Sequence, residues 1–498
     1  MDGWPAAARD PAAEGGPITR AAATAVLVFA WAGGVIAQTS PPPSPASTTW
    51  TIRDWSRIEM WRFFEPRPGG GDNEYAFGAN RLFASVQRTD RAFDLTAALQ
   101  YVHFAGLPSN AVGPGPLGTG AVYFAHAGRS DSHQVYLRYA NVRLKRIVPA
   151  TTIQVGRMPY SSGGEAASGN AKIEAVKLQR VAARLIGEFE WSIYQRAYDG
   201  VRLDTAHPGW SGTAIAFHPT QGGFEDAAGL MMPGVTVLGA AATVRSAVSS
   251  PAVQYQVFSY RYRDTRAITQ RPDNTGRPAT SIDVGINTFG ATVIVAPAAE
   301  HGRQWDGFLW IAAQSGSWYE QRHRAESLAA EAGHQWTTAR WQPWLRGGYL
   351  FASGDRDPSD NRHGTFFEML PTVRRYAQTA LYSQMNNTDL FVQLLARPHA
   401  KINARIDWHR VGLASSHDAW YFGSGATQQR GAIFGFATRP SFGARHLATI
   451  GEGSLDYAIA PHWSVNGYLS VGRGGGVVTP AFAGRTIVFG YVENVVQF

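Results

Sequence analysis

The amino-acid sequence predicts an all-β protein, a closed antiparallel transmembrane β-barrel of about 18 strands with long outer loops and short periplasmic turns. Three observations predict this fold class. Segments of about 10 residues with alternating apolar and polar side chains recur along most of the chain. Long connections between these segments alternate with short ones. The last segment also alternates, and it ends in the aromatic residue Phe498.

The N-terminal region predicts export. Residues 21–37 form a short apolar stretch that follows Arg20 and ends in Ala37. Such a stretch, ending in small residues, is typical of a secretory signal peptide, so we expect residues 1–37 to be one. The region before Arg20 is long and contains acidic residues, and a membrane anchor is therefore the alternative interpretation.

The composition restricts the class of protein. Outside the N-terminal stretch the sequence has no run of about 18 apolar residues, which excludes a helical membrane protein. The sequence has no cysteine, which excludes disulfides, thiolate metal sites and cysteine nucleophiles. Residues 38–53 are rich in Pro, Ser and Thr and predict a linker, so residues 54–498 remain for the barrel.

The net charge of +8 is carried almost wholly by arginine. A basic protein can bind nucleic acid, an anionic membrane surface or acidic solutes. Single arginines here lie among aromatic and apolar residues at the spacing of strands, whereas nucleic-acid binders usually cluster their basic residues. We therefore expect no nucleic-acid partner.

The alternation is clearest in two segments. In residues 93–101 the apolar residues Phe93, Leu95 and Leu99 share one face, and polar residues such as Gln100 lie on the other. Residues 402–409 repeat the pattern, with isoleucine, alanine and tryptophan set against asparagine, arginine, aspartate and histidine. In an outer-membrane barrel the apolar face contacts lipid and the polar face lines the lumen, whereas in a soluble sandwich the apolar face would point to a core.

The lengths of the connections favour the barrel over the sandwich. Long connections (105–130, 159–190, 353–387 and 413–451) alternate with short ones (88–90, 146–149, 398–400 and 461–462). This rhythm, with an even strand count and both chain ends on the periplasmic side, is typical of a bacterial outer-membrane barrel. The expected strands are residues 55–65, 74–87, 91–104, 131–145, 150–158, 191–204, 212–218, 233–244, 252–264, 281–297, 304–315, 325–338, 340–352, 388–397, 401–412, 452–460, 463–472 and 485–498.

The last strand supports outer-membrane localisation. Phe498 closes an alternating strand with Val496 and Val492 at even steps behind it, which resembles the signal read by outer-membrane assembly machinery. Asn494 and Gly490 interrupt this apolar face. An ordinary edge strand that happens to end in phenylalanine is the alternative.

Catalytic motifs are scarce. The sequence contains no zinc-protease HExxH, no phosphate-binding P-loop and no GxSxG nucleophile elbow. We therefore expect transport rather than catalysis. A barrel enzyme with a pair of carboxylates in its lumen and a purely structural or adhesive barrel remain as alternatives.

One acidic cluster could bind a cation. Asp355, Asp357 and Asp360 lie close together in the segment GDRDPSDNRHG, and carboxylates suit a hard cation such as Ca²⁺ in an outer loop. The segment lacks the bidentate glutamate and register of an EF-hand. A solvated, turn-forming loop is the alternative interpretation, and no other cofactor is expected.

Arginines on strand faces are the candidate functional residues. An arginine that faces lipid within the hydrocarbon costs about 2–4 kcal/mol, so arginines near the middle of strands should face the lumen. A ring of guanidinium groups there, held by carboxylates, would select anions. The alternative is that lumen Arg and Asp side chains simply pair and fill a wide barrel. The candidate residues are Arg138, Arg157, Arg196, Arg202 and Arg405.

Several segments resemble the alginate export family. The segment TIQVGRMPY, which ends at Tyr160, is followed by RLIGEFEWSIYQRAYDGVRL (184–203), and both are similar to family motifs. The early segments RIEMWRFFEP, DNEYAFGANRLFASVQ and RAFDLTAALQYVHF and the later FASGDRDPSDNRHGTFFEMLPT (351–372) are similar as well. Together they cover most of the mature chain in the family's order.

The resemblance implies an 18-stranded outer-membrane barrel whose arginine-rich lumen passes a polyanionic polysaccharide such as alginate, with long loops gating both ends. Arg157, Arg196, Asp199 and Arg202 occupy motif positions, and Arg138 lies in a similar strand. Simple alternation would turn Asp199 toward lipid unless a bulge intervenes. The expected partners are an anionic polysaccharide or small anionic solutes, outer-membrane lipid and possible periplasmic export proteins.

Overall fold

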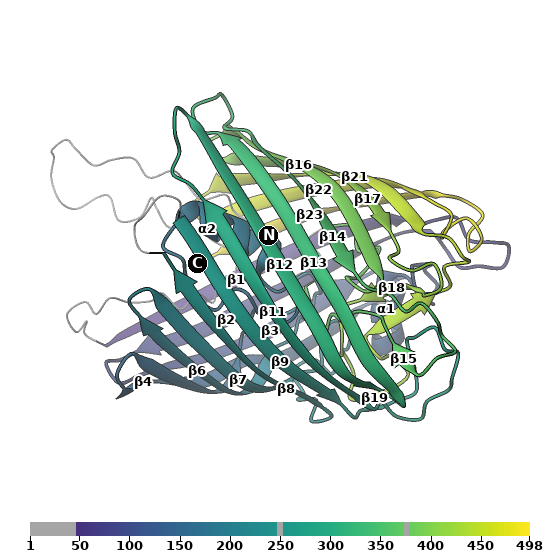
Figure 1. Ribbon diagram of the computed structural model, residues 1–498, viewed down its shortest axis with the longest axis horizontal. Helices are drawn as coiled ribbons and strands as arrows, with labels where there is room; N and C mark the ends of the chain where they lie inside the picture. The colour runs from purple at the N-terminus through teal and green to yellow at the C-terminus, as the bar shows by residue number, and fades with distance from the viewer. Residues whose placement is uncertain (1–45, 247–251, 373–377) are drawn as a thin grey trace.

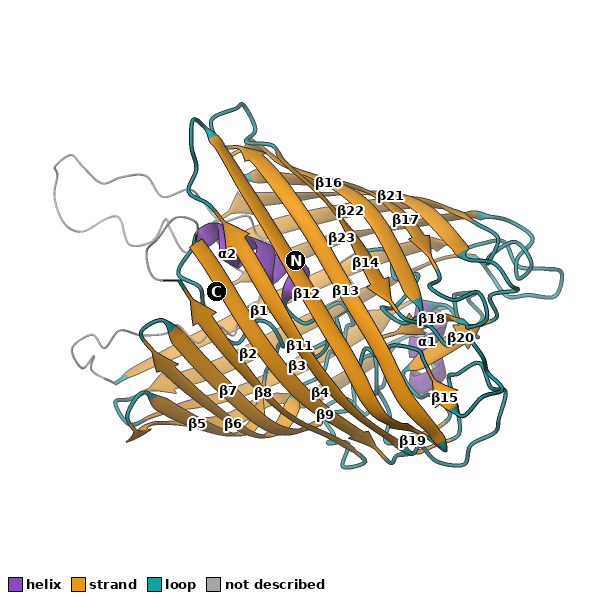
Figure 2. Cartoon of the chain, in the orientation of Figure 1, coloured by secondary structure: helices purple, strands orange, loops and turns teal. Residues whose placement is uncertain are grey.

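A computed structural model describes residues 46–246, 252–372 and 378–498. The predicted signal peptide, residues 1–37, lies outside the described residues. Within them the chain forms a closed antiparallel β-barrel, as the sequence predicts (Figures 1 and 2). Its main sheet has 19 strands, of which the short β15 (Arg362–His363) pairs only with β13 and lies outside the wall.

The remaining strands follow one another around the wall in chain order, and β1 closes the barrel by pairing with both β2 and β23. All the expected strands are present. The strands of the wall are β1 (Ser47–Arg62), β2 (Glu74–Thr89), β3 (Phe93–Ala105), β4 (Ser132–Val148), β5 (Thr151–Met158), β6 (Tyr198–His207), β7 (Trp210–Pro219), β8 (Val235–Arg245), β9 (Ala252–Asp264), β11 (Val284–Ala296), β12 (Arg303–Trp318), β13 (Gln321–Trp336), β14 (Trp344–Ala352), β16 (Asn387–His399), β17 (Ile402–Gly412), β21 (His446–Ala460), β22 (Trp463–Gly474) and β23 (Thr486–Gln497).

The two ends of the barrel differ. At one end, here called the turn end, β1 begins, β23 ends and short turns join the strands. The opposite end, the loop end, carries the long connections with α1 (Thr119–Ala127) and two small strand pairs (Figure 1). These pairs are β10 (Ala267–Ile268) with β19 (Arg430–Gly431), and β18 (Trp420–Gly423) with β20 (Phe436–Arg439).

Side chains alternate between the two faces of the wall as the sequence predicts. Leu99 and Ile406 point outward and are 53% and 64% exposed, whereas their neighbours Gln100 and Asp407 point inward and are 1% and 2% exposed. An apolar outer face and a polar inner face are the reverse of a soluble fold and are typical of a barrel that contacts lipid. Among the described residues, no helix is both long and apolar enough to span a bilayer.

Several strand boundaries differ from the prediction, most of all at the starts of β1, β6 and β21, and β21 begins at His446 instead of at residue 452. β1 begins at Ser47, so residues 47–53 of the predicted linker belong to the barrel wall. β6 begins only at Tyr198, because the chain before it stays in an irregular loop in which Gln195 has a positive φ of 56°. The predicted strand 191–204 is therefore too long at its start, and Arg196 lies on a loop.

Two of the long connections fold into the barrel. Residues 159–197, here called the inserted loop, include α2 (Ala171–Val176) and a π-helical turn, η1 (Lys177–Val181). Asn170 caps α2 by accepting hydrogen bonds from the backbone N–H groups of Lys172 and Ile173, both 3.0 Å long. Figure 2 shows α2 toward the turn end. The second connection, described for residues 353–372 and 378–386, is called the partner loop.

Candidate solute pathway

The charged side chains that point into the lumen are separated by sign. The wall from β1 to β8 turns mainly basic side chains inward, and the wall from β9 to β23 turns mainly acidic ones. The first set, here called the basic wall, comprises Arg53, Arg57, Arg81, Arg138, Arg143, Lys145, Arg202 and Arg245. The second set, the acidic wall, comprises Asp264, Asp306, Glu331, Asp389, Asp407, Glu452, Asp456 and Glu493.

Each wall also contains a few charges of the other sign. Glu59, Asp94 and Asp204 lie on the basic wall, and Arg346 and Arg405 lie on the acidic wall. The basic wall nevertheless has a net positive charge, and the acidic wall has a net negative charge. Facing walls of opposite charge create an electric field across the lumen.

A β-bulge places two side chains of the basic wall next to the inserted loop. The pairing of β3 with β4 shifts register between Ala98 and Leu99, opposite Arg138. The extra residue turns both Arg138 and Tyr139 inward. Arg138 lies 2.5 Å from the carboxylate of Glu188, to which the hydroxyl of Tyr139 also donates. The inserted loop thus presents an anion to the basic wall.

The same loop presents cations to the acidic wall. Lys172 Nζ donates to Gln335 at 2.8 Å, lies 3.5 Å from Asp306 and sits 3.5 Å from the ring centre of Trp344. Arg180 binds both carboxylate oxygens of Glu331, with its Nε 2.9 Å from each. The charges of the loop therefore complement both walls and dock it in the lumen.

The inserted loop and the partner loop are joined by their backbones. The N–H of Gly187 donates to the carbonyl of Leu370 at 2.8 Å, and the N–H of Leu370 donates to Leu185 at 2.9 Å. Ile186 and Leu370 form a parallel β-bridge, and both side chains are fully buried. Movement of one loop out of the lumen while the other stays would therefore break these hydrogen bonds.

The family match decides what kind of barrel this is. The alginate export family matches residues 69–467, which is most of the chain. The chain belongs to the alginate export family. No curated protein matches it significantly.

Solved structures show the same fold. OccK9 (OpdG) of Pseudomonas aeruginosa is 11% identical with a TM-score of 0.58, and the match covers 91% of this chain and 98% of that one. OccK2 (OpdF) of the same organism, in complex with glucuronate, is 8% identical with a TM-score of 0.53 over 91% and 98%. OccAB3 of Acinetobacter baumannii is 10% identical with a TM-score of 0.51 over 91% and 99%.

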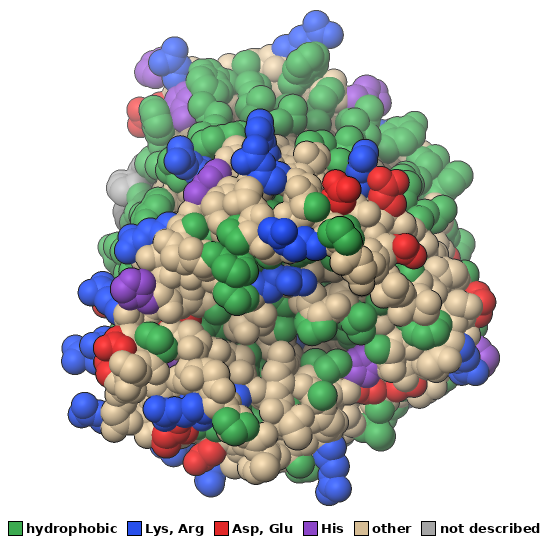
Figure 3. Space-filling view, turned by 90° about the vertical axis from the view of Figure 1, so that its right-hand side faces the viewer, with side chains coloured by type: hydrophobic (Ala, Val, Ile, Leu, Met, Phe, Trp, Pro, Cys, Tyr) green, Lys and Arg blue, Asp and Glu red, His purple; other side chains and the backbone are tan. Residues whose placement is uncertain are grey.

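This alginate export family member is an outer-membrane channel, and its neighbours are outer-membrane porins. In such barrels short turns face the periplasm and long loops face outward, so the turn end is periplasmic. Figure 3 shows the loop end, where Lys and Arg side chains reach the middle of the face as well as its rim.

Most of the predicted arginines lie inside the barrel. Arg138, Arg196 and Arg202 are buried and Arg405 is half-buried. Arg202 pairs with Asp204 at 2.8 Å, and Arg405 pairs with Asp407 on its own strand. The predicted pairing of lumen arginines with carboxylates is therefore present in this structure, and anion binding by these arginines stays a prediction.

Arg157 and Asp199 lie on the outer face, which corrects their assignment to the lumen. They are direct partners in the pairing of β5 with β6, while their neighbours Met158 and Tyr198 point inward and are buried. Arg157 binds Asp199 through two hydrogen bonds of 2.8 and 2.7 Å. A bidentate pair offsets much of the cost of an outward charge, which explains why an arginine can occupy this face.

The three aspartates of the predicted calcium loop do not converge. Asp355 is buried, whereas Asp357 accepts from the N–H of Ser359 at 3.0 Å and Asp360 accepts from the N–H of Arg362 at 2.7 Å. Among the described residues these carboxylates form no group within ligating distance of one another. Two of the three stabilise turns, as expected for a turn-forming loop.

Sequence reasoning missed Arg57 of the basic wall. It alternates with Ile58 and Met60, which point outward and are exposed, and it binds Glu59 on its own strand and Glu493 across the barrel seam. The alternation within the expected strand 55–65 contained this signal. The contact of Glu188 with Arg138 has no comparable signal in the sequence, because the two residues are far apart along the chain.

Asp418 anchors the outer loops to each other. One carboxylate oxygen accepts hydrogen bonds from the N–H of Asp355 at 2.7 Å and the hydroxyl of Thr365 at 2.5 Å. The other accepts from the N–H of Ala419 and the hydroxyl of Tyr421, both at 2.7 Å. Burial raises the pKa of the Asp418 carboxyl to about 6, because desolvation outweighs these hydrogen bonds.

We expect this anchor to weaken as the pH rises from about 4 to about 7. The anchored carboxyl of Asp418 holds its proton more tightly than a free aspartate, whose pKa is about 3.9. Its contribution to the stability of the anchored loops is therefore fully present below about pH 3.9. It is lost as the pH rises through about 6, and the loss amounts to about 3 kcal/mol.

Hydrogen exchange measures this effect at the amides of Asp355 and Ala419. Corrected for intrinsic rates, their protection should fall about 100-fold across this range. Asp418→Asn should abolish the dependence on pH. An equal fall in this variant would show that another group is responsible.

Proposed function

We propose that this barrel is an anion-selective channel whose solute is an acidic polysaccharide of uronate units, such as alginate. The observation that carries the proposal is the basic wall, whose inward arginines line one side of the lumen opposite an acidic wall. Arginine suits this role because its planar guanidinium binds carboxylates in a bidentate manner and keeps its charge. The family match supports the same class of solute.

The periplasmic half of the basic wall is the part that a solute can reach. Arg53, Arg143 and Arg245 lie toward the turn end and are only half-buried, whereas Arg57, Arg138 and Arg202 are buried farther in, under or beside the inserted loop. A polyuronate entering from the periplasm would therefore meet the first group before the loops move. The others would become accessible when the inserted loop leaves its position.

A general porin for small acidic solutes is the second candidate. The structure favours it in one respect, because the inserted loop and the partner loop occupy the lumen and are hydrogen-bonded to each other. Two structural neighbours were solved with small carboxylates, OccK2 with glucuronate and OpdK with vanillate. These supply suitable probes for comparison with an oligomeric uronate.

The test is ion current through the purified barrel in a planar bilayer under a salt gradient. The reversal potential should show anion preference, and an oligomeric uronate added on the periplasmic side should block the current. Arg53→Gln combined with Arg143→Gln should weaken the block about tenfold, or ~1.4 kcal/mol, because two half-buried charges are lost. The matched control is Arg88→Gln, which removes an exposed arginine of β2 that also lies at the turn end of the barrel.

The outcomes separate the two candidates. Block by the oligomer that exceeds block by free glucuronate supports a polysaccharide channel. Equal block by monomer and oligomer supports the small-solute porin. A cation-preferring current would contradict both, since both depend on the basic wall.

A further inference from the structure

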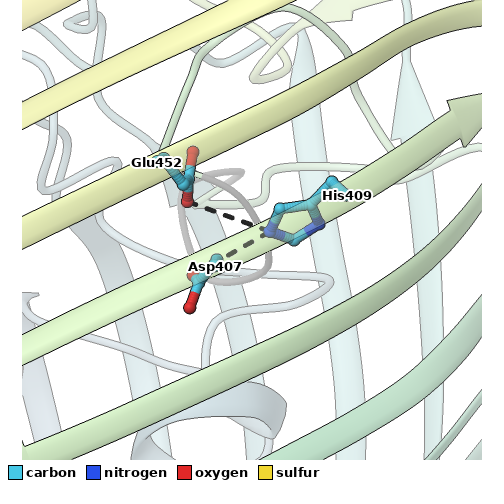
Figure 4. Close-up of side chains that lie close together, drawn as sticks. All are labelled: Asp407, His409 and Glu452. Carbon is cyan, nitrogen blue, oxygen red and sulfur yellow. Dashed lines mark ion pairs between the residues drawn. The ribbon is translucent and has the colours of Figure 1, made fainter.

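A second cluster of charged side chains lies on the acidic wall, on two neighbouring strands. His409 of β17 points between the carboxylates of Asp407, on its own strand, and Glu452 of β21 (Figure 4). Its Nε2 lies 3.8 Å from Asp407 Oδ2 and 3.9 Å from Glu452 Oε1. All three side chains are buried, and one potential ligand atom of each lies within 4.8 Å of the others.

Two atoms of this cluster have no hydrogen-bond partner among the described residues. His409 Nε2 is buried without one, and so is Asp407 Oδ1. A buried polar atom without a partner costs about 1–3 kcal/mol, so such atoms need an explanation. Here both belong to side chains of the same cluster. A bound cation would give them a partner.

The other nitrogen of His409 is already fixed. Its Nδ1 lies 2.9 Å from Asp389 Oδ2 and 3.1 Å from Asp389 Oδ1. A hydrogen bond from Nδ1–H to this carboxylate leaves the lone pair of Nε2 directed toward Asp407 and Glu452. Metal-binding histidines commonly have this arrangement, in which a carboxylate orients the ring and makes the ligating nitrogen more basic.

The charges of the cluster also leave room for a cation. Asp389, Asp407 and Glu452 are three carboxylates, and Arg405 is paired with two of them. With a neutral imidazole, these described side chains carry a net charge of −2. One divalent ion would neutralise them.

We propose that Asp407, His409 and Glu452 bind one divalent transition-metal ion, preferentially Zn²⁺, with Asp389 orienting the histidine. One imidazole and two carboxylates leave a coordination position open, which suits zinc. Ligand atoms around tetrahedral zinc at about 2.0–2.2 Å lie about 3.3–3.6 Å apart. The distances of 3.8 and 3.9 Å from His409 Nε2 need to contract only slightly, whereas the oxygens of Asp407 and Glu452, within 4.8 Å of each other, have to move closer together. Ca²⁺ and Mg²⁺ fit less well because they prefer oxygen ligands throughout.

A bound ion would change the lumen as well as link β17 to β21. It would add two positive charges to the acidic wall beside Arg405. Glu452 also accepts hydrogen bonds from Thr379 of the partner loop and from Tyr468. The site would therefore connect the wall with the end of a loop that occupies the lumen.

The experiment measures metal content of the full folded chain and needs no transport assay, so its failure is distinct from failure of the proposed function. The purified barrel is loaded with ZnCl₂, dialysed against metal-free buffer and analysed by mass spectrometry. We expect about one equivalent of zinc in the wild type. His409→Gln, Asp407→Asn and Glu452→Gln should each lose it. Asp389→Asn should weaken binding about 10–100-fold, as is typical for loss of an orienting partner.

The matched control is His462→Gln, which removes an exposed histidine in a periplasmic turn and should retain the metal. Folding of each variant is verified by its heat-modifiable mobility in gels. If His409→Gln does not fold, the wild type is loaded with Cu²⁺ instead, and the electron paramagnetic resonance spectrum of the bound ion tests the site. Coupling to one imidazole nitrogen supports the site, and its absence contradicts it. Wild-type zinc content no higher than that of folded His409→Gln would overturn the proposal and leave a protonated histidine within an ion-pair network.

Discussion

Replacing residues 163–194 with a short Gly-Ser linker is expected to raise the single-channel conductance about fivefold or more, because barrels of 16–18 strands leave an aqueous lumen unless a segment fills it. The removed segment carries Lys172, Arg180 and Glu188, which bind it to both walls. It also carries the backbone that bonds to the partner loop. The shortened variant therefore loses both the segment that fills the lumen and the hydrogen bonds that join it to the partner loop.

The measurement is current through single channels in a planar bilayer at fixed salt. A suitable control carries the same linker in place of residues 337–343, a periplasmic turn that does not enter the lumen. It should keep the wild-type conductance. An unchanged conductance in the shortened variant would mean that the partner loop or the outer loops close the lumen without the inserted loop.

Joining the two loops covalently is expected to have the opposite effect. Ile186→Cys combined with Leu370→Cys places two thiols on a β-bridge, whose partners lie about 4.7–4.9 Å apart and therefore within the 4.4–6.8 Å range of disulfides. The native chain has no cysteine, so no other thiol can react. If a polymer passes only when the loops separate, the disulfide should reduce uronate-oligomer flux at least about tenfold, and a reductant should restore it.

Flux of labelled uronate oligomers into proteoliposomes, before and after reduction, measures this effect. Each single-cysteine variant should behave as the wild type under both conditions. Flux that does not respond to the disulfide would show that the polymer passes beside the joined loops. Small-ion conductance, measured in parallel, indicates whether the barrel itself remains intact.

The wall of the barrel could be predicted from local pattern alone. In the strands that contain Leu99 and Ile406, the two faces follow from alternation, because successive side chains of a strand point to opposite sides. Arg157 does not follow the rule that charge avoids lipid. The cost of charge in lipid predicts a lumen position for it, yet its register partner Asp199 compensates that charge on the outer face.

The contents of the lumen could not be predicted in this way. Arg180 of the inserted loop binds Glu331, and Glu188 binds Arg138, across long separations in sequence. No local pattern specifies which distant charge a loop will meet. The bulge at Arg138 is a second example, since alternation alone would have turned Tyr139 outward.

The seam between β1 and β23 has a consequence for biogenesis. The N–H of Ile52 donates to the carbonyl of Phe498 at 3.0 Å, and the N–H of Phe498 donates to Ile52 at 2.8 Å. β1 is synthesised before β23 and can pair with it only after β23 is complete. Until then both strands have an unpaired edge that could pair with other chains. The pairing of β1 with β23 joins the described strands that are farthest apart in sequence, and it completes the barrel. Premature termination of synthesis would therefore produce an open, aggregation-prone sheet instead of a narrower barrel.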